Sequence, residues 1–307
     1  MEIINELYKK YYNDNSNNDM ASSHWKVEGE DNVQLKGGRV EIKGRGGFGD
    51  YIPKGLYSSI RNSIHLALVN KYLSQHSSGN PITIENAKKA AERSDRLFTF
   101  DCAKHVVAYE KILKALNANS FKEANIKKVC IIGDGYGYFS SFLKHQNPEI
   151  KLFTVNLGKQ LLFDAQNTKN NHPYATFGIL HKVEDLSHNH DFTFIEAENY
   201  HLVGEVDADL FINIASMQEM TPEIVDNYFQ YIKGSKQEEK YFFCCNRVKK
   251  VLIGGETLIF DKYAWGDCEV IYEEENCDWY SKFPVQKPPF WLPFDGALKA
   301  RLVKYSQ

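Results

Sequence analysis

The chain has 307 residues, of which 43% are hydrophobic and 25% are charged, and its formal net charge is -3. This is ordinary globular composition, which excludes a disordered or collagen-like chain. The near balance of 37 basic and 40 acidic residues lacks the electrostatic footprint of a duplex-binding protein, so we expect no nucleic-acid partner. No apolar run approaches the roughly 18 residues of a membrane span, and the first residues lack the apolar core of a signal peptide. Six cysteines without a CxxC pair indicate reduced thiols and a cytoplasmic protein.

Residues 1–120 are predicted to form a helical, loop-rich N-terminal appendage. Helical spacing of apolar residues predicts helices over 2–12, 56–73, 86–97 and 101–116, with Thr83 as the N-cap of the third. Residues 13–19 are polar with turn chemistry, and residues 20–52 are expected to be irregular. The glycine-rich stretch at 44–50, with Arg45, lacks the preceding strand and the Lys-Ser/Thr of a P-loop. It is interpreted either as a lid over an acceptor or as a plain flexible loop.

The pattern changes at residue 127, where short apolar runs begin to alternate with helical segments. Strands are predicted at 127–133, 151–156, 192–196, 209–215, 241–246, 268–272 and 297–305, and helices at 138–145 and from residue 221. This alternation predicts an α/β fold, with a Rossmann-like, doubly wound sheet over residues 121–307.

A glycine turn follows the first of these strands and precedes a helix. Its residues are Gly133, Asp134, Gly135, Tyr136 and Gly137. A glycine-rich turn in this context brings a ligand close to the backbone and to the positive end of a helix, which suits a carboxylate or a phosphate. The dinucleotide pattern needs a third Gly or Ala, and the sequence places Tyr138 or Ser140 there. A nicotinamide cofactor is therefore disfavoured.

The acid inside this glycine pattern resembles motif I of class I S-adenosylmethionine methyltransferases. The resemblance implies S-adenosylmethionine as the cofactor, with its methionine end against Gly133, Asp134, Gly135 and Gly137. The second strand ends at Asn156, where the family has an acid for the ribose hydroxyls, so that contact would be a neutral hydrogen bond.

The third and fourth strands end in further candidates for cofactor binding. Glu196 follows the third strand, where methyltransferases contact adenine, and Glu198 lies beside it; either is otherwise a solvated loop charge. Asn213 and Ser216 end the fourth strand, at the edge of an open α/β sheet that faces the ligand crevice. Asn213 is alternatively a purely structural residue.

Four segments resemble the sugar O-methyltransferases of bacterial surface-polysaccharide loci. They are DLFINIASMQEM at 209–220, FFCCNR at 242–247, the glycine pair at 254–255 with Tyr-Ala-Trp at 263–265, and ENCDW at 275–279. The resemblance covers roughly residues 100 to 305 and implies methyl transfer to a hydroxyl of a nucleotide sugar or a surface glycan. In methyltransferases an N-terminal appendage usually caps the acceptor pocket.

The chemistry that this resemblance implies needs in-line positioning and a base close to the acceptor hydroxyl. Glu219 is the first choice for the base, and its alternative role is to cap the helix that follows. Gln218, Asn246 and Arg247 are predicted to fix the acceptor hydroxyls. An ion pair between Arg247 and Glu219 would lower the basicity of the carboxylate and argue against its role as the base.

Two aromatic pairs are further candidates. His105 and Tyr109 share a helix face, and Trp265 and Trp279 are candidates for stacking on a sugar, but packing is the favoured role of all four. No adjacent acid pair lies at the strand edges, so no metal is expected. A methyltransferase for a non-sugar small molecule and a non-catalytic subunit with the same fold remain alternatives. Peripheral association with glycan-assembly machinery and a homo-oligomer are left open.

Overall fold

The computed structural model describes residues 2–13, 32–36, 39–43, 56–94, 96–285 and 289–306. The predicted polar stretch after Asn13 and the glycine-rich loop at 44–50 with Arg45 lie outside the described residues.

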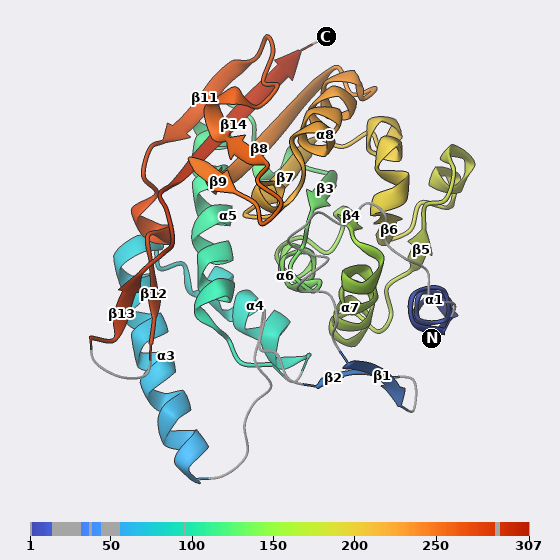
Figure 1. The fold of residues 1–307 in the computed structure, drawn as a ribbon. Coiled ribbons are helices and arrows are strands. Elements are labelled where there is room, and N and C mark those ends of the chain that lie inside the picture. Colours follow the sequence, from blue (N-terminus) through green and yellow to red (C-terminus); the bar gives the residue numbers. More distant parts are fainter. Residues whose placement is uncertain are drawn as a thin grey trace.

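An eight-stranded sheet forms the centre of the chain, in the order β11-β14-β8-β7-β3-β4-β6-β5 (Figure 1). Strands β5, β6, β4, β3, β7 and β8 run parallel, and β14 is antiparallel to both β8 and β11. The strands are β3 Lys128–Ile132, β4 Lys151–Asn156, β5 Phe177–Ile179, β6 Phe192–Glu196, β7 Leu210–Ile214, β8 Glu239–Arg247, β11 Glu269–Glu274 and β14 Leu298–Ser306. The predicted α/β sheet is thereby confirmed, and the carboxyl ends of β3, β4, β6, β7 and β8 share one edge.

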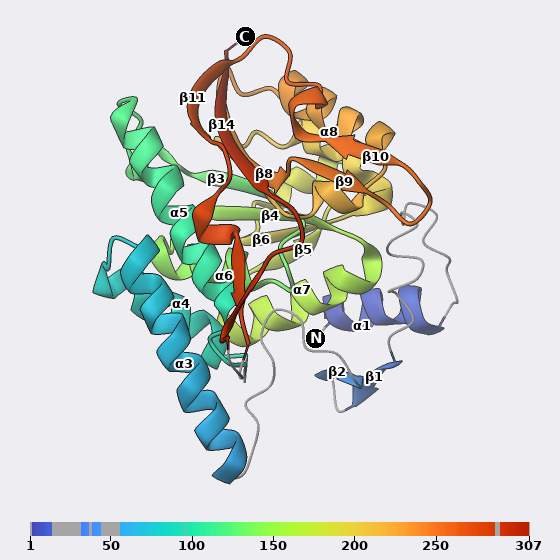
Figure 2. The ribbon, with the colours of Figure 1, turned by 60° about the vertical axis from the view of Figure 1, so that its left-hand side comes forward.

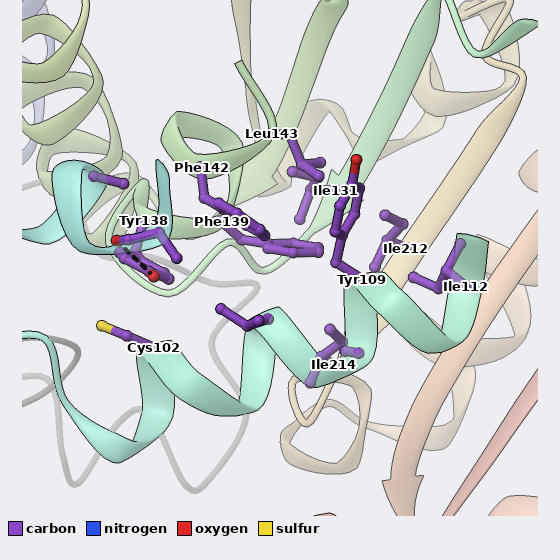
Figure 3. Close-up of a cluster of buried hydrophobic side chains, with 14 of the residues drawn as sticks. Cys102, Tyr109, Ile112, Ile131, Tyr138, Phe139, Phe142, Leu143, Ile212 and Ile214 are labelled. Atoms are coloured by element: carbon purple, nitrogen blue, oxygen red, sulfur yellow. Dashed lines mark hydrogen bonds between the residues drawn. The ribbon is translucent and has the colours of Figure 1, made fainter. Parts of the chain in front are cut away.

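Helices cover both faces of this sheet, as the apolar strands require. Val129 and Ile131 of β3 belong to the core cluster under helices α4 to α7, whereas Cys130 and Ile132 belong to the cluster under α8. Alternate side chains therefore enter different cores, which explains why a buried parallel strand reads as a continuous apolar run. Figure 2 shows the two layers on either side of the sheet. Figure 3 shows aromatic side chains of α6 between α5 and strands β3 and β7.

The helices are α1 Glu2–Tyr8, α3 Leu56–His76, α4 Pro81–Glu92, α5 Phe100–Ala118, α6 Tyr138–Gln146, α7 Gly158–Asn171 and α8 Pro222–Gly234. A π-helical turn, Lys9–Asn13, continues α1, and short 3₁₀ turns are Glu123–Asn125, Val183–His188, Ala197–Glu205, Met217–Glu219, Phe260–Lys262 and Asp278–Tyr280. The prediction that Thr83 caps α4 is wrong. Asn80 is the N-cap, because its side-chain oxygen accepts from the backbone N–H of Ile82 at 3.0 Å and Pro81 occupies the first helical position.

Three small antiparallel pairs lie outside the main sheet. They are β1 Asn32–Lys36 with β2 Arg39–Lys43, β9 Lys249–Val251 with β10 Thr257–Ile259, and β12 Lys282–Pro284 with β13 Trp291–Pro293. The first pair corrects the expectation that residues 20–52 are wholly irregular. The other two pairs are not apparent from the sequence, because each of their strands has only three residues.

Helices α4 and α5 share one buried cluster with the sheet. Ala87 of α4 and Val106 of α5 belong to the same cluster as Ile131 of β3. The described C-terminal part of the appendage thus packs directly on the sheet, and the boundary near residue 120 stays a prediction. None of the helices among the described residues combines the length and the apolar character needed to cross a bilayer. All six cysteines are free thiols.

Candidate functional site

The glycine turn between β3 and α6 holds a backbone that other residues rarely adopt. Gly133, Gly135 and Gly137 have φ values of +78°, +64° and +70°. The N–H of Gly133 donates to the carbonyl of Val155 at 2.8 Å, which ties the turn to the end of β4. A Cβ on Gly137 would lie 2.6 Å from the backbone oxygen of Asp164 in α7. Glycine is therefore required at residue 137 by space as well as by backbone angle.

The acid in this turn faces the helix. Asp134 is buried, and its Oδ1 accepts from the N–H of Ser140 at 3.0 Å in the first turn of α6. Asp134 does not line the cavity at the carboxyl edge of the strands that is described below. The structure thus places Asp134 where it pairs with an N–H in the first turn of α6, and its predicted contact with a cofactor stays a prediction.

Asp164 of α7 is a second buried carboxyl beside Asp134. It accepts from Nδ2 of Asn156 at 3.0 Å. Burial raises the pKa of Asp134 to about 7, and burial together with the charge of Asp134 raises the pKa of Asp164. Each carboxyl has one oxygen without a hydrogen-bond partner among the described residues. Burial thus favours the protonated form of both carboxyls, immediately behind the glycine turn.

Asn213 and Ser216, at the end of β7, bond to the end of β3. Nδ2 of Asn213 and Oγ of Ser216 each donate to the carbonyl of Ile132 at 2.8 Å. Ala215, between them, has φ of +60°, a strained backbone for a residue with a side chain. These contacts hold the loop after β7 against the glycine turn, so the two predicted cofactor residues are brought to the turn but bond to protein.

Asn246 and Gln218 extend the same hydrogen-bond network. Nδ2 of Asn246 donates to Oδ1 of Asn213 at 2.7 Å, and its Oδ1 accepts from the N–H of Gln218 at 3.0 Å. Oε1 of Gln218 accepts from the N–H of Arg247 at 2.9 Å. Both amides are buried. We therefore interpret Gln218 and Asn246 as residues that position the loops, and direct contact with an acceptor stays a prediction.

A cavity of about 60 Å³ lies at the carboxyl edge of the strands. It combines Gly133 of the glycine turn, Asn156 of β4, Ser216 after β7 and Glu219 of the following 3₁₀ turn. The remaining lining is mostly apolar, from Val155, Leu157, Ala197, Met220, Ile224 and Tyr228. Four of the predicted site residues thus meet in one cavity.

Glu219 places a carboxyl among the residues that line this cavity. Burial raises its pKa to about 7, and the positive charges of Lys250 and Arg247 oppose this shift more weakly. Arg247 forms its ion pair with Asp295 at 3.5 Å, and its guanidinium lies over the ring of Phe294. Glu219 is therefore poised to exchange a proton near neutral pH, as a general base requires.

The N-terminal helix covers the position predicted for adenosine. Lys10 and Tyr11, in the π-helical turn, reach Glu196 at 2.8 Å and 2.5 Å respectively. The ring of Tyr11 also packs on Gly158, because a Cβ there would lie 1.9 Å from its Cζ. Glu196 is buried beneath these contacts, and Glu198 lies 3.4 Å from the same lysine. Sequence reasoning missed Lys10 and Tyr11, because nothing in a short polar helix indicates where it docks.

The remaining candidates pack into the cores, as favoured from the sequence. The rings of His105 and Tyr109 lie 4.8 Å and 5.2 Å from phenylalanines of α6. Trp265 is buried with its indole N–H bonded to the carbonyl of Phe260. Trp279 is also buried, and it lines a different cavity from that of Glu219. The described residues contain no group of three or more histidine, cysteine or acidic side chains that would suit a metal ion.

Comparisons with known proteins find similarity only at the level of structure. No family model matches the chain, and no curated protein matches it. TehB from Haemophilus influenzae is similar at 12% identity and a TM-score of 0.42, over 63% of this chain and 62% of TehB. The chain thus spans less than two thirds of the length of TehB.

Two further structures are similar over more of the chain. Magnesium protoporphyrin IX methyltransferase from Synechocystis, solved with bound SAH, matches at 12% identity and a TM-score of 0.38, over 78% of this chain and 97% of the enzyme. The mitomycin 7-O-methyltransferase MmcR matches at 7% identity and a TM-score of 0.40, over 81% of this chain and 69% of MmcR. At such identities these are similarities of fold, and the proposals below rest on the chain's own residues.

Proposed function

We propose that the chain is an S-adenosylmethionine-dependent O-methyltransferase that acts on a sugar hydroxyl, with Glu219 as the general base. The observation that carries this proposal is the meeting of the glycine turn and Glu219 in one cavity at the carboxyl edge of a doubly wound sheet. Ligands of open α/β sheets bind at this edge. The sugar acceptor rests on the resemblance of residues 209–220 and 242–247 described above.

The residues fit the methionine end of the proposed cofactor. The cavity exposes Gly133 of the glycine turn, beside the N-terminus of α6, where a carboxylate is favoured. Asn156 and Ala197 lie further along the same edge, toward the predicted adenosine position. When bound, the cofactor supplies a methyl group activated by a sulfonium.

The adenosine end requires more room than the described residues leave. Pockets for ligands of this size measure about 300–1,000 Å³, and this cavity measures about 60 Å³. Lys10 and Tyr11 bond to Glu196, which directly precedes Ala197 of the cavity lining. We therefore infer that the N-terminal turn shifts away from Gly158 and Glu196 when the whole cofactor binds.

Glu219 would take the proton of the acceptor hydroxyl, because the deprotonated form of a base with a pKa near 7 is well populated at neutral pH. The buried network of Asn213, Asn246 and Gln218 would hold the loop that carries Glu219. Arg247 lies beside this network, at the end of β8, and is available to orient the acceptor.

Methyl transfer from isotopically labelled S-adenosylmethionine to a panel of sugars and nucleotide sugars tests this proposal. We expect transfer to a sugar by the native chain, about 10²- to 10⁴-fold less by Glu219→Gln, and unchanged transfer by Glu238→Gln, whose side chain is exposed. Transfer only to non-sugar acceptors would show that the acceptor is not a sugar. Cofactor binding without transfer to any acceptor would favour a non-catalytic subunit.

A further inference from the structure

A second and larger cavity, of about 460 Å³, lies on another side of the molecule. It is bordered by α3, the start of α5, the turn Asp278–Tyr280 and the hairpin β12–β13. Figures 1 and 2 both show α3 beside this hairpin. The cavity is lined by Lys71, Tyr72, Gln75, His76, Phe100, Asp278, Trp279, Ser281, Lys282 and Trp291. None of these residues lines the cavity of Glu219, so the two cavities are distinct.

Aromatic rings form one wall of this second cavity. The ring of Tyr72 lies 4.8 Å from His76 and 4.4 Å from Phe100, and Phe100 lies 5.5 Å from Trp291. The polar atoms of two of the aromatic residues are already engaged. The hydroxyl of Tyr72 donates to the carbonyl of Trp279 at 2.7 Å, and the indole N–H of Trp279 donates to Glu274. Trp291 is only partly buried, so its ring is the one best placed to contact a ligand.

Polar side chains surround this wall, with both signs of charge. They are Lys71, Gln75, His76, Asp278 and Lys282. Within the described residues, no hydrogen bond or ion pair engages any of these five side chains. Lys71, Gln75, Asp278 and Lys282 are exposed, and burial lowers the pKa of His76, which favours its neutral form. These five side chains, called the rim below, therefore offer both hydrogen-bond donors and acceptors around an apolar wall.

We propose that this second cavity binds a saccharide, a sugar unit of the acceptor that is separate from the unit that is methylated. A pyranose ring presents an apolar C–H face, which packs on an aromatic ring, and a rim of hydroxyls that both donate and accept hydrogen bonds. An apolar peptide or a lipid tail would leave the five polar side chains of the rim without partners, and a phosphate would leave the aromatic wall uncovered. Two lysines against one aspartate favour a sugar that carries a carboxylate.

Aromatic and cationic side chains connect this second cavity with the edge that carries Glu219. The ammonium of Lys104 lies 4.7 Å from the ring of Phe100, which lines the cavity, and 5.0 Å from Phe294. The guanidinium of Arg247, at the end of β8, lies over the ring of the same Phe294, at 5.0 Å. Lys104 and Phe100 are buried, so these contacts place the second cavity and Arg247 at two ends of one packed cluster. In the proposal, a glycan acceptor of several units would span the surface between them. This inference rests on the proposed function only for the glycan nature of the acceptor.

Binding of two small glycosides to the native chain tests the proposal without any cofactor. The probes are methyl β-D-glucuronide and methyl β-D-glucoside, followed by saturation-transfer NMR and by tryptophan fluorescence. We expect both to bind, the glucuronide more tightly, and Trp291→Ala to weaken both about tenfold, in line with the loss of one stacking contact. Gln75→Ala should weaken both without disturbing the aromatic wall.

Two control variants lie on the same elements but outside the cavity. Leu292→Ala is on the same hairpin as Trp291, and Ser74→Ala is on the same helix as Gln75, and neither residue lines the cavity. Both should bind the glycosides as the native chain does. S-adenosylhomocysteine should bind Trp291→Ala and the native chain equally, so failure of the proposed cofactor site is seen separately from failure of the saccharide site.

The proposal is overturned if neither glycoside binds the folded native chain, or if Trp291→Ala and Gln75→Ala bind them as well as the controls do. It is also overturned if uridine diphosphate binds this cavity and the glycosides do not, because the cavity then recognises a nucleotide.

Discussion

Replacing Glu219 by glutamine is expected to lower activity by about 10²- to 10⁴-fold and to stabilise the fold at alkaline pH. Burial raises the pKa of this carboxyl from 4.5 to about 7, and each unit of pKa corresponds to about 1.4 kcal/mol. For an acid whose pKa is higher in the folded state, the folded chain binds the extra proton between these two pH values. The stability that Glu219 contributes is therefore greatest below pH 4.5, falls as pH rises toward 7 and stays low above it.

The ionised carboxylate should thus cost the native fold about 3 kcal/mol at pH 8. Glu219→Gln avoids this cost, so the difference in unfolding free energy between variant and native chain should grow from near zero at pH 4.5 to about 3 kcal/mol at pH 8. Urea unfolding at both pH values measures this difference, with Glu238→Gln as the exposed control.

The pH profile of activity tests the same carboxyl independently. The kcat/KM of the native chain should rise with pH and level off above about 7, as Glu219 loses its proton. Glu219→Gln should lack this rise. A glutamine variant that is no more stable than the native chain at pH 8, or that keeps the rise in kcat/KM, would refute this account of Glu219.

Three further substitutions test the loops that build the cavity. Gly137→Ala should destabilise the fold more than Gly79→Ala in urea unfolding. The two glycines have similar φ values, +70° and +76°, but only the new Cβ at residue 137 would collide with a backbone atom, the oxygen of Asp164 at 2.6 Å. Equal losses of unfolding free energy would contradict this. Asn213→Ala should lower the unfolding free energy by about 1–3 kcal/mol, since it leaves buried polar groups unpaired; an unchanged midpoint would show that the network is dispensable. Gly158→Ala should displace Tyr11 and speed limited proteolysis of the N-terminal helix, and an unchanged cleavage rate would show that Tyr11 does not depend on Gly158.

The parallel strands and the glycine turn were predictable from the sequence because each depends on local pattern. Residues 128–132 read as a strand that is buried on both faces, and the structure places them at the centre of the sheet. The three-residue strands and the cap at Asn80 were missed or misplaced, since such short elements depend on their tertiary neighbours more than on periodicity.

The candidate site was predictable in composition but not in contacts. The sequence placed Glu219, Gly133, Asn156 and Ser216 at strand ends, and these four line one cavity. It could not show that Tyr11 would reach Glu196, since the two residues are 185 positions apart. Nor could it show that Asn246 would bond to Asn213, because this contact depends on the register of β8 against β7.

Calorimetric titration of S-adenosylhomocysteine into the folded chain tests the central claim most directly. We expect the native chain to bind it, Gly133→Val to lose binding because its side chain would collide with Ser216 at the cavity wall, and Gly79→Val, with a similar φ and nothing within 4 Å, to bind normally. Circular dichroism would show that each variant is folded. Failure of the folded native chain to bind, or equal binding by Gly133→Val, would contradict the claim that the glycine turn forms the cofactor site.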